Sequence, residues 1–367
     1  SVGLQQTLEK AVEISNWRKK WKPAPKNEEL WKETKHFGIG MSTIFYGVGL
    51  GSAGKHMART GSYVLVKSDG SANFAVGNTE MGQGAITVLS QIVADGLGIP
   101  YEMVRMLPVD TSRVPDSGPT VASRTTTFSG RALLNACKEI NNRLQKVAAD
   151  VLKCSLDRTT RQGKYWKDEE SGRTVNVINI MEEAFKRRVN LAAAGWDVSP
   201  ETEFDSEKGQ GKCPYIVYAW ATNVVEVEVD IDTGTIETKR VIAVHDVGKA
   251  INPETLEGQI QGGSVQGLGY GRFEEIIWDE HGKIQNPDLG RYIIPSSKDL
   301  PDIESYYIES EYPEGPFGAK GMGEQPLMGL APAFSNAVYN AIGIRFTEIP
   351  LTPERVWSTI QELRGDK

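Results

Sequence analysis

The sequence has few of the residues that build a protein-ligated metal site or a disulfide framework. It contains three cysteines and four histidines in 367 residues, and no Cys-x-x-Cys pair. These residues are dispersed along the chain: Cys137, Cys154, Cys213, His36, His56, His245 and His281. Structural zinc sites and disulfide scaffolds need such residues close together, so we expect free thiols and no metal held by side chains.

Long apolar runs and a basic surface are also missing. No run approaches the ~20 apolar residues that cross a bilayer, and the first residues are amphipathic and charged, unlike the apolar core of a signal peptide. The net charge is −7, with Lys and Arg interspersed among Asp and Glu. We therefore predict a cytoplasmic globular protein that binds neither membrane nor nucleic acid.

The patterns that are present predict an α+β fold. Residues around the Asp69–Gly70 turn predict two strands and then a helix that ends at Gly96 and Gly98. Strict alternation from Val225 to Val229, followed by a turn, predicts a hairpin. Helices are predicted at residues 4–20, at 129–153, near 331–342, and after Thr352 and Pro353.

Four segments combine glycine with polar residues in an unusual way. They are EMGQGA (80–85), DSGPTVASRTTTFSG (116–130), LEGQIQGGSVQGLGYG (256–271) and GPFGAKGMGEQPLMGLAPAF (315–334). Glycine lets backbone N–H groups approach an anion, and hydroxyls before a helix suit a phosphate or a pterin. Tight helix packing is the alternative explanation. A further cluster, GLGSAGKH, ends in His56 where a P-loop needs a hydroxyl, so no P-loop is predicted.

In this order along the chain, the segments resemble the xanthine oxidase family of molybdenum hydroxylases, specifically the C-terminal half of the molybdopterin-binding subunit. The resemblance covers roughly residues 38–357. It implies an elongated fold with two mixed sheet-and-helix lobes that bind the molybdenum cofactor. The implied domains are 1–35, an N-terminal helix and connector; 36–200, a first lobe; and 201–367, a second lobe with the catalytic glutamate.

The resemblance implies one catalytic residue, Glu324, in the family's GAKGxGE motif. This glutamate is the base beside molybdenum that accepts a proton as a water-derived oxygen attacks an electron-poor carbon. The apolar stretch that follows Glu324 is expected to desolvate it. Gly321 and Gly323 are expected to let the backbone pass close to the metal centre.

The resemblance also implies where the cofactor lies. Gly82, Gln83 and Gly84 are expected along the pterin and its pyrophosphate, and Thr120, Val121, Ala122, Ser123 and Thr125 along the pterin or a dinucleotide tail. Gln266 is expected near the pterin dithiolene, and Gly323 beside Glu324. The implied cofactor is molybdopterin, in the cytosine dinucleotide form common in bacteria, whose molybdenum carries a terminal sulfido or selenido ligand.

The resemblance further implies a complex. A complete molybdopterin-binding subunit is about twice as long as this chain, so a second such subunit, or the N-terminal half of the same one, is expected to close the site. Split subunits of this kind occur in the anaerobic nicotinate dehydrogenase type. Separate [2Fe–2S] and FAD subunits are expected to take up the electrons, because this chain has no cysteine pattern for an iron–sulfur cluster.

The substrate class stays open between several possibilities. The first is an N-heterocycle, nicotinate-like or purine-like, although an aromatic clamp of xanthine oxidoreductases would fall near Leu50, with Phe45 and Tyr46 only nearby. The second is the aldehyde oxidase or hydroxybenzoyl-CoA reductase branch of the same family. The third is a cofactor-binding assembly subunit without catalysis.

Overall fold

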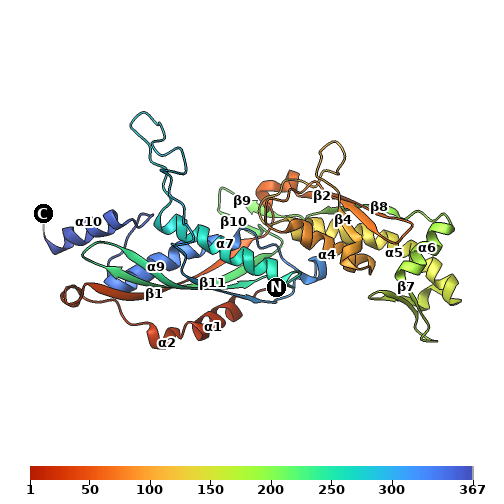
Figure 1. The fold of residues 1–367 in the computed structure, drawn as a ribbon, viewed down its shortest axis with the longest axis horizontal. Coiled ribbons are helices and arrows are strands. Elements are labelled where there is room, and N and C mark those ends of the chain that lie inside the picture. The colour runs from red at the N-terminus through yellow and green to blue at the C-terminus, as the bar shows by residue number, and fades with distance from the viewer. Residues whose placement is uncertain (366–367) are drawn as a thin grey trace.

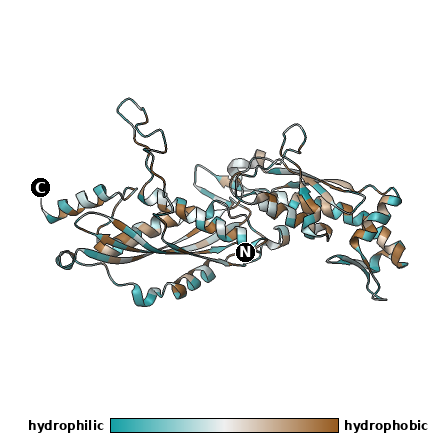
Figure 2. Cartoon of the chain, in the orientation of Figure 1, coloured by the Kyte–Doolittle hydropathy of each residue, from teal (hydrophilic) through white to brown (hydrophobic). Residues whose placement is uncertain are grey.

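Two mixed four-stranded sheets, one in each lobe of an elongated molecule, organise the fold of this computed structural model, which describes residues 1–365 (Figure 1). Both chain ends belong to the left-hand lobe of Figure 1. Apolar residues are concentrated in the strands of that lobe and along the helices that cover the sheets (Figure 2). The predicted α+β class and the elongated two-lobed shape are confirmed.

The left-hand lobe is built on the sheet β1–β11–β12–β13. Its strands are β1 (Lys35–Gly47), β11 (Tyr218–Asp230), β12 (Ile236–Asp246) and β13 (Asp302–Ile308). β11 runs antiparallel to β1 and to β12, and β13 runs parallel to β12. Helix α9 (Leu330–Ile342) packs on β1 and β11, and α1 (Leu4–Ile14) packs on β11 and β12. The sheet is therefore covered on both faces, and the valines of β11 pack into the apolar clusters on its two sides.

Helix α9 approaches β1 unusually closely, and two glycines make this approach possible. A Cβ added at Gly38 would lie 2.1 Å from the carbonyl oxygen of Ala337, and one at Gly40 would lie 2.1 Å from its backbone nitrogen. Any side chain at either position would push α9 off the sheet. We call residues 319–324 the candidate catalytic loop. Because α9 begins a few residues after Glu324, the two glycines that seat α9 on the sheet also help to fix the position of this loop.

The right-hand lobe is built on the sheet β4–β3–β2–β8. Its strands are β2 (Arg59–Val66), β3 (Ala72–Ala75), β4 (Val104–Met106) and β8 (Ala192–Val198). Helices α4 (Ala85–Leu97) and α5 (Gly130–Leu152) pack together against this sheet and share one apolar core with it. A π-helical turn, η3 (Thr125–Ser129), leads into α5. Such turns are frequent at functional sites.

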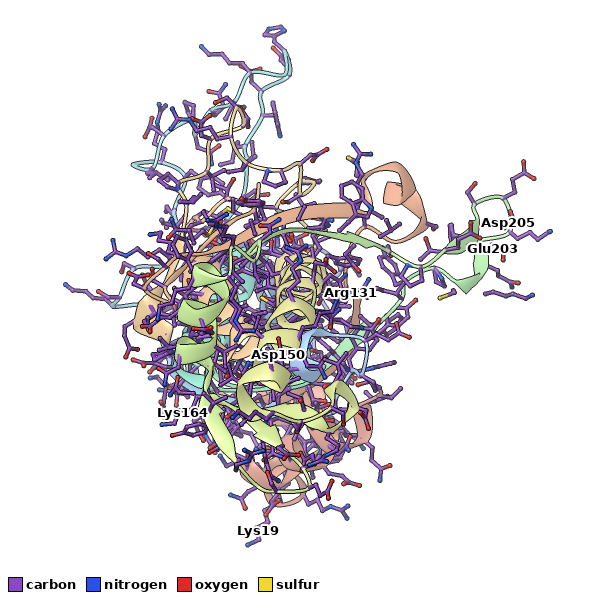
Figure 3. All side chains as sticks on the ribbon, turned by 90° about the vertical axis from the view of Figure 1, so that its right-hand side faces the viewer. Lys19, Arg131, Asp150, Lys164, Glu203 and Asp205 are labelled. Carbon is purple, nitrogen blue, oxygen red and sulfur yellow. The ribbon has the colours of Figure 1, made fainter. Side chains whose placement is uncertain are left out.

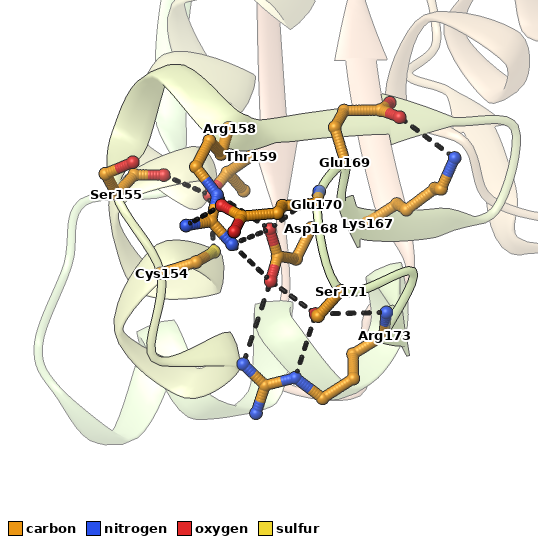
Figure 4. Close-up of polar contacts among 10 residues, drawn as sticks. All are labelled: Cys154, Ser155, Arg158, Thr159, Lys167, Asp168, Glu169, Glu170, Ser171 and Arg173. Carbon is orange, nitrogen blue, oxygen red and sulfur yellow. Dashed lines mark hydrogen bonds and ion pairs between the residues drawn. The ribbon is translucent and has the colours of Figure 1, made fainter.

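A small three-stranded sheet at the far end of this lobe is held by a buried carboxylate, Asp168 (Figure 4). The sheet consists of β5 (Thr159–Gln162), β6 (Tyr165–Asp168) and β7 (Thr174–Asn176), and α6 (Val177–Lys186) follows it. Asp168 accepts hydrogen bonds from Ser171 and from the guanidinium of Arg158, whose Nη2 lies 2.8 Å from Asp168 Oδ1. These two donors hold the pKa of Asp168 well below its usual range.

The remaining elements include two longer helices, α7 and α10, and several short ones. They are α2 (Trp17–Lys20), α3 (Asn27–Leu30), η1 (Ser52–Met57), η2 (Tyr101–Met103), η4 (Leu156–Arg158), β9 (Glu203–Asp205), β10 (Gln210–Cys213), α7 (Pro253–Arg272), η5 (Pro316–Gly318), α8 (Gln325–Met328) and α10 (Pro353–Arg364). Figure 3 shows the β9–β10 hairpin, with Glu203 and Asp205, projecting away from the body. None of the helices described in residues 1–365 is long and apolar enough to cross a membrane.

Most predicted elements are confirmed, and one prediction is wrong. The helix expected over 4–20 is broken, because Asn16 adopts a left-handed backbone (φ 54°) between α1 and α2. The predicted bounds of the lobes stay predictions; β1 pairs along its whole length with β11. Hydrophobic alternation in a single strand does not reveal its partner. The boundary near residue 200 stays a prediction.

Candidate active site

Loops from both lobes surround one cavity of about 510 Å³. All four glycine-containing segments contribute to its lining, although they are far apart in sequence. The predicted residues that line it are Gly82, Gln83, Gly84, Thr120, Val121, Ser123, Thr125, Gln266, Gly323 and Glu324. Ala122 is not part of the lining, but its backbone contacts Glu324. The structure thus brings all the sequence-predicted site residues together in one place.

Glu324 is held at this cavity by both of its carboxylate oxygens. The phenol of Tyr46, at the end of β1, donates to Oε2, and the backbone N–H of Ala122 donates to Oε1 over 3.2 Å. The backbone N–H of Glu324 in turn donates to Ser123 Oγ at 3.0 Å. Burial, and then the bond to Glu324, raise the pKa of Tyr46 above its usual range, so the phenol remains a donor.

The environment of Glu324 differs from the expectation that the following apolar stretch desolvates it. Glu324 is exposed within this chain, whereas Gln325 and Pro326 behind it are buried. The apolar residues of α9 face the sheet rather than the carboxylate. The chain therefore leaves this side of Glu324 open to whatever covers the cavity.

The neighbouring loop, residues 120–124, is strained. Ala122 and Ser123 both have positive φ values, 51° and 53°, which non-glycine residues rarely adopt. The guanidinium of Arg124 holds the loop from behind: it is only 1% exposed and donates to the carbonyls of Ser117, Pro119 and Arg59. Burial lowers the pKa of Arg124. Strained backbone held in this way is typical of functional sites.

Gly321 lines the cavity and also fits closely against this loop. A Cβ at Gly321 would lie 1.6 Å from the carbonyl oxygen of Ser123, and the N–H of Gly321 donates to Thr127 Oγ1 at 3.0 Å. Gly321 therefore permits contact between the two lobes, and the expectation that it lets the backbone pass close to a metal centre stays a prediction. At Gly323 a Cβ would meet only Ser123 Oγ, at 3.6 Å.

The loop before α4 is closed on itself by Glu80. Its carboxylate accepts hydrogen bonds from the backbone N–H groups of Gly82 (2.8 Å), Gly84 (3.0 Å) and Ile86 (2.9 Å). These bonds lower the pKa of Glu80 against the opposing effect of burial. The negative charge at the N-terminus of α4 is thus supplied by the protein itself.

Gln83, predicted to face the cofactor, uses its side chain within the same loop. Its Oε1 accepts from the N–H of Met81 at 2.7 Å, and its Nε2 donates to the carbonyl of Thr79 at 2.8 Å. Gln266 on α7 is exposed at the cavity. Of the two glutamines, Gln266 is the one whose side chain can reach a bound group.

A buried ion pair anchors the candidate catalytic loop from below. Lys320 Nζ lies 2.6 Å from Asp246 Oδ2, and both side chains are fully buried. The ammonium also donates to the carbonyl of Tyr218 at 3.1 Å, and the N–H of Gly3 donates to the same Asp246 oxygen at 3.1 Å. Burial lowers the pKa of Lys320, and Asp246 partly opposes this effect.

A second buried polar group lies directly behind Glu324. The Gln325 side chain is fully buried and donates to the carbonyl of Trp220 at 2.6 Å. It neighbours His245, whose ring nitrogens have no hydrogen-bond partner in the described part of the chain. Burial lowers the pKa of His245 to about 3, and Gln325 weakly opposes that shift. His245 is therefore a neutral core residue.

Aromatic side chains gather where β1 and β11 pair, and not at Leu50. Phe45 is 62% exposed, and its ring lies 5.5 Å from that of Trp220 and 5.7 Å from that of Tyr218. Tyr215 stacks edge-on against Tyr218 and is close enough to Tyr46 to influence its pKa. Phe45 and Trp220 are paired across β1 and β11 and alternate with Tyr46, so this aromatic cluster lies on the opposite face of the sheet from Tyr46, and none of its members lines the cavity.

Several of these residues were missed from the sequence. Tyr46, Glu80, Lys320 and Gln325 all hold the predicted site in place, yet only Glu80 left a local signal. A carboxylate just before a glycine turn and a helix start is a capping pattern, and it could have been recognised as one. The other three act across distances of 74 to 278 residues in sequence.

The cavity suits a large cofactor that brings its own metal. Among residues 1–365, no three His, Cys, Asp or Glu side chains are arranged to hold a metal ion. The lining instead offers hydroxyls, the Gln266 amide and glycine backbone, and Cβ atoms added at Gly82 or Gly262 would meet nothing within 4 Å. Such a donor set fits a pterin with a pyrophosphate, bound through neutral donors and close backbone contact.

Comparison with known proteins agrees with this chemistry. Residues 9–301 match the molybdopterin cofactor-binding domain family. The chain is 31% identical over 360 residues to the xanthine dehydrogenase molybdenum-binding subunit of Escherichia coli O157:H7, covering 97% of this chain and 46% of that protein. The chain thus spans about half the length of this relative.

Two solved structures have the same fold. A Cu,Mo-CO dehydrogenase superposes on the whole chain with a TM-score of 0.88 and 25% identity, and 46% of that chain is covered. Quinoline 2-oxidoreductase from Pseudomonas putida 86 has a TM-score of 0.84 and 25% identity over 97% of this chain and 45% of its own. The two names refer to different substrates, although the two proteins share one fold.

Proposed function

The chain belongs to the molybdopterin cofactor-binding domain family of the xanthine oxidase group of molybdenum enzymes, and from this premise we propose that it supplies the cofactor cavity and the catalytic base of a molybdenum hydroxylase. The substrate class we propose is an electron-poor N-heterocycle, with water as the oxygen source. The observation that supports this most directly is the convergence of four distant segments on one cavity that contains Glu324.

The residues of this chain would hold the cofactor in two groups. Gly82 and Gly84 offer close backbone contact on one side, and Thr120, Ser123, Thr125 and Gln266 offer polar groups on the other. When bound, the molybdenum cofactor, proposed as the cytosine dinucleotide form with a sulfido or selenido ligand, supplies two-electron redox chemistry. Partner [2Fe–2S] and FAD subunits are proposed to accept the electrons.

Glu324 is the proposed general base. Its two oxygens are oriented by Tyr46 and Ala122, and its open side faces the cavity. A base oriented in this way can accept the proton of an attacking water without a prior rearrangement of its side chain. The strain at Ala122 and Ser123 is maintained because Arg124 fixes the loop that donates to Glu324.

The proposed preference for an N-heterocycle over an aldehyde rests on the names of the compared proteins. Two of the three compared proteins carry the names of N-heterocycles, xanthine and quinoline. The turnover of heterocycles and of aldehydes by the purified complex tests this: faster turnover of aldehydes would place the protein in the aldehyde oxidase branch.

Replacing Glu324 by Gln in the purified complex tests the proposed base. We expect molybdenum content and melting temperature to stay unchanged while turnover falls by about 10²–10⁴-fold, the usual contribution of a general base. Glu348→Gln, at an exposed carboxylate outside the cavity lining, is the control and is expected to keep full turnover. A complex without molybdenum, or a fully active Glu324→Gln variant, would show that the chain is a non-catalytic assembly subunit or has another function.

A further inference from the structure

A long excursion between α7 and β13 exposes an unusual amount of apolar surface. We call residues 273–301 the arm. Figures 1 and 3 show it projecting at the top of the left-hand lobe, clear of the body. Exposed fractions reach 58% for Trp278, 74% for Leu289 and 61% for Ile293, and Ile276, Ile277, Ile294 and Leu300 are also exposed. Apolar side chains that are exposed together in one segment are typical of protein interaction sites.

The arm is internally ordered, although it lacks helices and has only an isolated bridge between Trp278 and Ile284. Asn286 is 7% exposed; its Oδ1 accepts from the N–H of Ile277 at 2.9 Å, and its Nδ2 donates to the carbonyl of Glu275 at 2.6 Å. Asp279 accepts from the N–H groups of His281 and Lys283, both at 2.9 Å. A long loop held in one shape by its own polar groups is preorganised to bind.

An exposed line on α7 connects the arm to the candidate active site. Gly258, Gly262, Gln266 and Tyr270 are spaced four residues apart, lie on one face of the helix and are all exposed. Gly262 and Gln266 line the cavity, and Tyr270, 59% exposed, lies just before the arm. A polypeptide that covers the open side of the cavity along α7 therefore arrives at the arm.

We propose that the arm, together with Tyr270, is the docking surface for the remaining part of the molybdopterin-binding polypeptide, the part that the matched relatives have and this chain lacks. The relatives extend to about twice the matched length, since the chain covers 46% of them. The inference rests on the proposed function, because that function requires the cavity to be closed by this part, whether as a separate subunit or as a segment of the same polypeptide.

Charge favours this occupant over a second copy of the chain. The arm has six acidic and three basic residues, so two arms placed face to face would repel each other. A companion with an apolar groove lined by Lys or Arg would satisfy both the exposed side chains and the carboxylates. Trp278 is the expected anchor, because buried tryptophans contribute disproportionately to binding.

Site-specific photocrosslinking in the intact complex tests the proposal. A benzoylphenylalanine at position 278 or 289 is irradiated in the purified native complex, and the crosslinked peptides are identified by mass spectrometry. We expect peptides from outside residues 1–367 that align with the unmatched half of the relatives. Crosslinks between two arms would identify a second copy as the occupant, and crosslinks only within residues 1–367 would show that the arm docks nothing; either result overturns the proposal.

A matched pair of variants provides an independent measurement. Trp278→Ser is expected to increase the rate at which the complex dissociates by at least tenfold, or, in a single polypeptide, to make the junction between the halves correspondingly more sensitive to protease. Trp196→Ser, at a tryptophan of similar exposure (55%) on β8, is expected to change neither. Equal behaviour of the two variants would contradict the proposal.

The molybdenum content of the same preparations separates this inference from the proposed function. If the expected crosslinks form but the complex lacks molybdenum, the docking surface stands and the proposed function fails. If molybdenum is present and Glu324→Gln is inactive while the crosslinks lead elsewhere, the function stands and the docking surface is wrong.

Discussion

Two loops line the cavity, and a glutamate in or beside each of them is held in a different way. Glu80 accepts three hydrogen bonds from backbone groups within six residues of itself. Glu324 is held by Tyr46, 278 residues away, and by Ala122, 202 residues away. The first loop is thus fixed by local geometry, and the second only by the complete fold.

The difference separates a structural carboxylate from one that is available for chemistry. All the bonds of Glu80 close its own loop, so it stabilises a shape. Each oxygen of Glu324 has one donor, and its remaining lone pairs face the cavity. A residue held by distant elements has a position that depends on many contacts, which suits a base that must be placed accurately.

The largest effect is expected from breaking the anchor of the Glu324 loop. Lys320→Met leaves Asp246 buried without its cation, and removing one partner of a buried pair typically costs about 3–5 kcal/mol. Chemical denaturation of the purified chain measures this. In the double variant Lys320→Met/Asp246→Leu most of the loss should be recovered, because no charge is then left unpaired. A single variant as stable as the wild type would refute the role of the pair.

Acid should distinguish the two loops. The pKa of His245 in the folded chain, about 3, lies below its value near 6.5 in an unfolded chain, so the unfolded state binds the proton first. Its contribution is present above pH 6.5 and falls by up to about 1.4 kcal/mol per pH unit below it. Glu80, with a pKa lowered from 4.5, keeps its contribution until the pH falls below about 4.5.

Hydrogen exchange at pH 5 to 6 measures this order of events. Amides of residues 319–330 should lose protection before those of 79–86, and His245→Asn should make the stability of the chain less dependent on pH in this range. Simultaneous loss of protection in both loops would show that His245 does not determine the acid response.

An intermediate effect is expected from Glu80→Gln. The amide can no longer accept from all three N–H groups, and the lost charge-assisted bonds should cost about 1–3 kcal/mol of stability. Molybdenum content should fall with it, whereas Glu324→Gln should change neither. Differential scanning calorimetry and metal analysis measure the stability and the molybdenum content. A Glu80→Gln variant that is normal in both would show that Glu80 does not stabilise its loop.

The smallest effect is expected from Tyr46→Phe. This change removes one of the two donors to Glu324 but keeps the ring, so about 1 kcal/mol, or up to tenfold in kcat, should be lost. Steady-state kinetics should show the loss in kcat with little change in KM. A loss as large as that of Glu324→Gln would mean that Tyr46 has a chemical role of its own.

The sequence predicted the features that local patterns encode. The β11–β12 hairpin, α5 and the Thr352 cap of α10 follow from alternation, helical spacing and a hydroxyl before Pro353, and the structure confirms them. The order of four motifs predicted which loops would meet, and these loops do line one cavity. The roles of the individual residues there stay predictions.

The features that the sequence did not predict depend on contacts between distant residues. The Lys320–Asp246 pair and the bond from Tyr46 to Glu324 exist only because β1, β12 and the candidate catalytic loop are brought together by the fold. The break at Asn16 depends on one backbone angle, which helical spacing alone does not reveal.

The pairing of β1 with β11 has a consequence for how the protein is made. Gly47 and Tyr218 are direct neighbours in the sheet, so the whole right-hand lobe is inserted between two adjacent strands. At typical synthesis rates of roughly 5–20 residues per second, β1 leaves the ribosome on the order of ten to thirty seconds before its partner. During that interval the inserted lobe can fold first, while β1, with its bare Gly38 and Gly40, is an unpaired strand whose backbone groups are open to pairing with other chains.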